Sequence, residues 1–154
     1  MQLIKIKFLL FILIIVSTAT FANCEKLQNS CEYYTCINIK KNCNNKSYFK
    51  RFGLKYCLKF EKKIKKFSPQ GQEWIQSVKS CLISSIEEAD QQLTCKEYKN
   101  VAIKHHTPCY FESGYCNLSF RDKRQVIQVI KFSLWKPSII KTAIQILNKC
   151  HNTK

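Results

Sequence analysis

The sequence predicts an all-α domain of about five helices, stapled by disulfides, with a cysteine-dense segment at its N-terminal end. Three observations carry this prediction. Apolar residues recur at steps of three and four, which is the spacing of one face of an α-helix. Only three glycines and three prolines occur, so few turn-forming residues interrupt this pattern. Ten cysteines, an even number, allow complete pairing within the chain.

The first part of the chain has the features of a secretory signal peptide. Two lysines precede an unbroken apolar run at 8–16, and small residues lead to a cleavage site after Ala22 or Ala19. A transmembrane anchor is the alternative, but crossing a bilayer takes about 20 apolar residues. The sequence therefore predicts a signal peptide at 1–22 and a secreted, extracellular protein without a transmembrane span. The mature chain, 23–154, is expected to form one domain.

The mature chain begins with its densest group of cysteines. The segment 23–47 is expected to form short helical turns that cannot bury a core alone, and it contains Cys24, Cys31, Cys36 and Cys43. Because secreted proteins meet an oxidising environment, all ten cysteines are expected to form disulfides.

A helix with an aromatic stripe is predicted over 48–66. The stripe is interpreted as core and not as a ligand site, and it consists of Phe49, Phe52, Tyr56, Phe60 and Phe67. Ser68 and Pro69 then provide an N-cap and a first helical residue. They predict a second helix over 69–86, which is expected to fold back on the first as a hairpin.

Three further helices are predicted in the second half of the chain. A third helix is expected over 87–104, followed by an irregular connection at 105–120. The fourth is expected over 121–135, and the fifth from Pro137 to Cys150. The residues expected to face inward on the fourth are Val126, Ile127, Ile130 and Leu134. The apolar residues that define the fifth are Ile139, Ile140, Ala143, Ile144 and Leu147.

The mature chain is strongly basic. Without the two lysines of the signal peptide, 24 basic residues face 10 acidic ones, which gives a net charge of +14. Such a charge is compatible with an anionic lipid, a heparin-like glycan or a nucleic acid as partner. However, only three of the basic residues are arginines, the side chain that phosphate binding favours. A solvated lysine-rich surface is therefore the preferred interpretation, and no nucleic-acid partner is expected.

No residue pattern indicates catalysis, a metal ion or a cofactor. The histidines, His105, His106 and His151, have no carboxylate at helical spacing, and no CxxC pair occurs. An even set of paired cysteines leaves no thiol to act as a nucleophile. No GxSxG, HExxH, glycine-rich phosphate loop or calcium loop is present. The chain is therefore not expected to be an enzyme.

Two sequons predict N-glycosylation. They begin at Asn45 and Asn117, and each lies beside a cysteine in a segment that is expected to be exposed and non-helical. Asn45 is the better candidate.

The order of the cysteines resembles that of a known family. From Cys24 the intervals are 7, 5, 7, 14, 24, 14, 14, 7 and 34 residues. Three short segments accompany them: Tyr-Cys-Leu-Lys-Phe at 56–60, Lys-Phe-Ser-Pro-Gln-Gly-Gln at 66–72 and Val-Lys-Ser-Cys-Leu at 78–82. In this order, and over nearly the whole mature chain, these features resemble the stanniocalcins, which are secreted helical glycoprotein hormones.

The resemblance implies a pairing scheme, which spacing alone leaves open. Carried over position by position, the implied disulfides are Cys24–Cys36, Cys31–Cys57, Cys43–Cys95, Cys81–Cys109 and Cys116–Cys150. The family has an eleventh cysteine that links two subunits, and this sequence has no counterpart to it. A monomer or a non-covalent dimer is therefore expected.

The resemblance also implies a function, namely hormone activity in an extracellular signalling protein that binds an unidentified receptor or protease. Vertebrate stanniocalcins act in calcium and phosphate homeostasis and inhibit pappalysin-type metalloproteases. The rival hypothesis is a cationic helical membrane-binding or defence protein. In that case the lysine-rich face of residues 55–66 would contact anionic lipid, and the aromatic stripe would insert.

Overall fold

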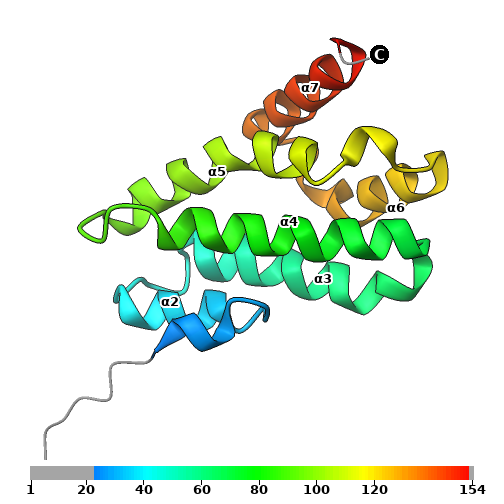
Figure 1. Cartoon of the computed structure of the whole chain (residues 1–154). Coiled ribbons are helices and arrows are strands. Elements are labelled where there is room, and N and C mark those ends of the chain that lie inside the picture. The colour runs from blue at the N-terminus through cyan, green and yellow to red at the C-terminus, as the bar shows by residue number, and fades with distance from the viewer. Residues whose placement is uncertain (1–22, 153–154) are drawn as a thin grey trace, which may run out of the picture.

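Helices of different lengths follow one another along the whole described chain (Figure 1). This computed structural model describes residues 23–152, so the predicted signal peptide at 1–22 lies outside the described part. The elements, with η for short 3-10 or π-helical segments, are η1 (Cys24–Leu27), α2 (Tyr33–Lys40), η2 (Phe49–Leu54), α3 (Lys55–Lys63), η3 (Ile64–Lys66), α4 (Pro69–Glu87), α5 (Cys95–Glu112), η4 (Tyr115–Asn117), α6 (Phe120–Ile130), η5 (Lys131–Ser133) and α7 (Pro137–Asn152). No strand occurs between residues 23 and 152, and the predicted all-α, disulfide-stapled fold is confirmed.

The first two predicted helices form the expected hairpin. The helix predicted at 48–66 is present as the consecutive segments η2, α3 and η3. The Ser68 hydroxyl then accepts a hydrogen bond from the Gly71 backbone N–H at 3.1 Å and caps α4. α3 and α4 run side by side (Figure 1), and the rings of Phe60 and Trp74 pack edge to face between them.

The third helix lies further along the chain than predicted. α5 begins directly after Thr94, which caps it, and it continues past Pro108. The irregular connection expected at 105–120 is therefore wrong for its first part, which is helical. Proline removes one intrahelical hydrogen bond, but the neighbouring Cys109 is buried and linked to Cys81, and this tertiary attachment holds the helix together.

The fourth and fifth helices are present, but they bury less than predicted. α6 ends at Ile130 and a 3-10 turn follows, so the helix does not reach residue 135. Of its expected inward residues, Val126 is buried whereas Ile127 is largely exposed. α7 packs against α5 and projects from the body (Figure 1), and its one buried residue is Ile146. Three of the apolar residues that define this helix in the sequence are exposed, namely Ile140, Ile144 and Leu147.

A buried carboxylate joins the N-terminal ends of α4 and α6. Asp122 accepts hydrogen bonds from the Ser68 backbone N–H at 2.9 Å, the Ser68 hydroxyl at 2.6 Å and the Ser119 hydroxyl at 2.8 Å. Ser68 and Ser119 are the N-caps of these two helices. Gly71 leaves room for this cluster, because a Cβ there would lie 2.8 Å from the Asp122 carboxyl carbon. One side chain therefore fixes where the two helices begin.

The core consists of two clusters along α4. Ile83 and Ile86, near its C-terminal end, pack with α2, η2 and the start of α5. Trp74 and Val78, in its first half, pack with α3 and α6. Phe52 contacts both clusters, so η2 connects the two halves of the interior.

Five disulfides cross-link these elements. The bonded pairs are Cys24–Cys36, Cys31–Cys57, Cys43–Cys95, Cys81–Cys109 and Cys116–Cys150. They are the same five pairs that the resemblance implies. Three of them hold the N-terminal segment together and fasten it to α3 and α5, the fourth joins α4 to α5, and the fifth joins η4 to α7. No cysteine between residues 23 and 152 is free.

Within the described range, none of the helices combines the length and the hydrophobicity needed to cross a bilayer.

Candidate functional site

An apolar cavity of about 290 Å³ lies between the helix hairpin and the C-terminal helices. Its walls come from η2, α3, α4, α5, α6 and α7, so most of the chain contributes to it. Three members of the aromatic stripe, Phe52, Tyr56 and Phe60, line it, while Phe49 and Phe67 are buried away from it. The stripe therefore has two roles, because its ends form core as predicted and its middle forms the wall of a cavity.

Another part of the cavity wall is aliphatic. α4 contributes Val78 and Leu82, α6 contributes Val126 and Ile130, and α7 contributes Ile146. Such surfaces favour a hydrocarbon ligand, because each methylene transferred from water to an apolar wall stabilises the complex by about 0.8 kcal/mol.

The cavity reaches the surface between α6 and α7. Ile127 on α6 and Leu147 on α7 both line it, and they are 48% and 59% exposed. Side chains that line a cavity and also face water mark the side from which a ligand enters.

Polar groups in the aromatic wall are held in their uncharged forms. Burial lowers the pKa of His106, whose Nδ1–H donates to the Ala102 carbonyl at 2.5 Å. Burial likewise raises the pKa values of Tyr34, Tyr48 and Tyr110. At neutral pH these four side chains therefore add no charge to the cavity.

A pair of hydroxyl groups forms a polar spot on the wall between α3 and η5. The Tyr56 and Ser133 hydroxyls hydrogen-bond to each other, and both residues are buried. The Lys59 ammonium lies 5.0 Å from the Tyr56 ring centroid, and the Lys136 ammonium lies 5.4 Å from the Phe52 ring centroid. These two rings are themselves 4.6 Å apart, so both cations lie beside the same part of the wall.

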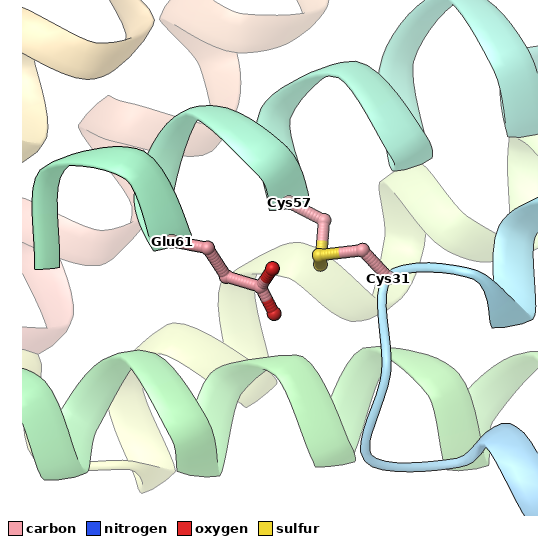
Figure 2. A group of neighbouring side chains, drawn as sticks. All are labelled: Cys31, Cys57 and Glu61. Atoms are coloured by element: carbon pink, nitrogen blue, oxygen red, sulfur yellow. A yellow bond between two sulfur atoms is a disulfide. The ribbon is translucent and has the colours of Figure 1, made fainter.

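A second polar group on the wall combines a carboxylate with a disulfide. Figure 2 shows the Glu61 side chain pointing toward the bond between Cys31 and Cys57. The three side chains have metal-ligand spacing, but a metal needs thiolates and these sulfurs are bonded to each other. Glu61 instead pairs with the Lys79 ammonium at 3.2 Å, which balances the charge of this wall. The donor set therefore does not fit a metal ion.

The sequons predicted from the sequence lie at the surface. Asn45 and Asn117 are both exposed. The hydroxyl residues of the two sequons have structural roles, since Ser47 donates to the Asn38 side chain and Ser119 caps α6. Glycosylation of either asparagine stays a prediction.

Comparisons with protein-family models, with curated proteins and with solved structures found no match to this chain. The relationship to stanniocalcins therefore remains a hypothesis.

Sequence reasoning missed the cavity, although the predicted stripe contains three of the eight Phe, Tyr and Trp residues that line it. A stripe with helical spacing looks the same whether its rings fill a core or line a cavity, because the difference depends on how α6 and α7 approach α3. One signal was present in the sequence, namely Lys59, which lies within the segment that carries the stripe.

Proposed function

We propose that this chain is a secreted, stanniocalcin-like signalling protein that acts by binding an extracellular receptor or protease. The observation that carries the proposal is the set of five disulfides, whose pairs coincide with those the family resemblance implies. Disulfides of this number are compatible with a secreted protein. They also give a rigid helical module, so that little conformational entropy is lost when it docks on a partner.

A binding role without catalysis is part of this proposal. The buried His106 imidazole is oriented by a backbone carbonyl and not by a carboxylate. Asp122 is occupied by two serine N-caps, and Glu61 by a lysine. These titratable groups therefore have structural partners, whereas a catalytic dyad would pair a base with a nucleophile.

The proposal is tested with a pappalysin-type metalloprotease. The protein is purified from the medium of secreting cells, mixed with the protease at increasing ratios, and cleavage of the protease's substrate is followed. Inhibition that saturates near one molecule per protease is expected, and reduced and alkylated protein should not inhibit. If inhibition is absent, and calcium and phosphate uptake by epithelial cells is also unchanged by the protein, the stanniocalcin-like role is wrong.

A second candidate function is binding to anionic membranes. The surface that favours it lies around η5 and is not the face of residues 55–66 that was expected from the sequence. The aromatic stripe cannot insert, because Phe49, Tyr56 and Phe67 are buried. Around η5, however, Phe132 and Trp135 are 67% and 74% exposed beside Lys131 and Lys136. Aromatic side chains flanked by lysines are typical of surfaces that bind anionic bilayers.

Vesicle leakage separates the two candidates. Membrane activity predicts that the protein releases dye from anionic vesicles and not from neutral ones, less so in salt, and that Phe132→Ser with Trp135→Ser abolishes release. The signalling proposal predicts no release from either kind of vesicle.

A further inference from the structure

We propose that the cavity binds one molecule of a single-chain lipid with a carboxylate head group, such as a medium-chain fatty acid. The apolar walls take the hydrocarbon chain, and the polar spot between α3 and η5 takes the carboxylate. This inference does not rest on the function proposed above, since a carrier, a hormone or a membrane-binding protein could each use such a site.

The size and lining of the cavity suit a hydrocarbon chain. Its volume of about 290 Å³ is close to the lower end of ligand pockets, which span roughly 300–1,000 Å³. It is also about twice the volume of an apolar cavity of ~150 Å³ that binds benzene. A flexible chain can follow the wall from Ile130 and Val126 toward Val78 and Leu82. Ordered water is a poorer occupant of this part, because each water needs two to four polar partners.

The polar spot provides the donors that a carboxylate requires. An ionised carboxylate only accepts hydrogen bonds, and the Tyr56 and Ser133 hydroxyls can both turn from each other to donate to it. Neither Lys59 nor Lys136 lines the cavity, but their ammonium groups lie 5.0 Å from the Tyr56 ring and 5.4 Å from the Phe52 ring, close enough to offset part of the negative charge. A neutral alcohol would gain only the hydroxyl contacts, and a cationic head group would be repelled.

The surrounding charge favours an anion at this position. From residue 113 onward the chain has eight lysines and arginines and one acidic residue, Asp122. That carboxylate is buried against Ser68 and Ser119 and offsets only one of these eight positive charges. Glu61, which lies on α3 together with Tyr56, is already paired with Lys79. The potential at the entrance should therefore attract carboxylates and increase their rate of association.

The first test compares three probes that share a twelve-carbon chain: dodecanoate, dodecanol and dodecyltrimethylammonium. The secreted protein is freed of bound lipid on a hydrophobic resin and titrated calorimetrically with each probe. One dodecanoate is expected to bind per chain. Its affinity should be about tenfold or more above that of dodecanol, because the alcohol cannot form a charge-assisted hydrogen bond. The cation should bind most weakly. Equal affinity for all three probes would overturn the assignment of the head group.

The second test removes the two cations. Lys59→Gln with Lys136→Gln should weaken dodecanoate binding by about tenfold or more and leave dodecanol binding unchanged. Lys62→Gln with Lys141→Gln is the matched control, because it removes the same charge from exposed positions on α3 and α7. Equal losses in the two variants would show that net charge alone acts, and would overturn the site.

The third test fills the cavity. Ala143 on α7 lines it, and Ala143→Phe should abolish binding of dodecanoate and dodecanol while circular dichroism stays unchanged. Ile39→Ser on α2, an exposed position outside the lining, should bind normally. Binding that exceeds one molecule per chain and survives Ala143→Phe would place the lipid on the outer apolar surface, and would overturn the proposal. If Ala143→Phe does not fold, the variant with Lys59→Gln and Lys136→Gln still tests the proposal.

Discussion

Asp122 is a single carboxylate on which the start of two helices depends. Burial by itself would raise its pKa, but the hydrogen bonds from Ser68 and Ser119, with Arg121 nearby, outweigh burial and hold the pKa below its usual value. An unfolded aspartate has a pKa of about 3.9. Because the folded value is lower, the ionised carboxylate stabilises the fold above that pH, and this contribution is lost as the pH falls through the folded pKa.

Asp122→Asn should therefore destabilise the protein at neutral pH by about 1–3 kcal/mol, because an amide cannot accept all three hydrogen bonds as well as a carboxylate. The difference from wild type should shrink below pH ~4, where Asp122 becomes protonated. Urea unfolding at pH 7 and at pH 3 measures both effects. Asp90→Asn, at an exposed position, is the control and should change stability by less than about 0.5 kcal/mol. A neutral-pH difference that persists undiminished at pH 3 would contradict this account.

Gly53 marks a close contact between η2 and α2. A Cβ at this buried position would lie 2.4 Å from Cδ1 of the Tyr34 ring, which is itself packed in the first core cluster. Gly53→Ala should therefore cost about 1–3 kcal/mol through overpacking, although alanine favours helix more than glycine does. Gly114→Ala has open space but a φ of +93°, and should lose about 1 kcal/mol through backbone strain alone. Thermal unfolding of both variants checks the contrast, and a Gly53→Ala protein as stable as wild type would show that Tyr34 can move aside.

At the scale of elements, α7 depends on one covalent attachment. It packs on α5, buries Ile146, and is tied to η4 through Cys116–Cys150. Replacing both cysteines by serine should increase amide hydrogen exchange over 137–152 by an order of magnitude or more, because a lost disulfide typically removes about 2–4 kcal/mol. Replacing Cys24 and Cys36 by serine should leave the exchange of α7 unchanged. Exchange in α7 that is insensitive to the Cys116–Cys150 bond would mean that packing on α5 is sufficient.

The helices and the hairpin formed by the first two could be predicted from the sequence, because they depend on the local spacing of apolar residues. The start of α5 could also have been found, since Thr94 and Glu97 form a capping box that the apolar pattern alone obscured. The continuation of α5 past Pro108 could not, because it depends on the long-range bond to Cys81 and on burial. The exposure of Ile127 depends likewise on the approach of α7, which no local pattern encodes.

At the scale of the whole molecule, most of the disulfides and the cavity lie in different parts of the structure. The N-terminal disulfides surround the first core cluster, which contains α2 and η2. The cavity lies mainly at the second cluster, although Tyr34 and Tyr48 of the first cluster also line it. At the second cluster, α6 and α7 are held mainly by apolar contacts, Asp122 and Cys116–Cys150. One end of the molecule is thus rigid, whereas the other has a wall whose position depends on a single cross-link. A ligand that enters beside α7 would contact the first cluster through Tyr34 and Tyr48.

This difference predicts the order in which the disulfides are reduced. Thiol–disulfide exchange requires access to a sulfur, and both cysteines are partly exposed in Cys43–Cys95 and Cys116–Cys150, whereas both are buried in Cys24–Cys36. The two exposed bonds should therefore open first under mild reductant and Cys24–Cys36 last, as measured by timed alkylation and peptide mass spectrometry. Dodecanoate should slow opening of Cys116–Cys150, because bound lipid would stabilise the wall that α7 forms, and should leave Cys43–Cys95 unaffected. Protection of both bonds to the same extent would instead indicate general stabilisation of the fold.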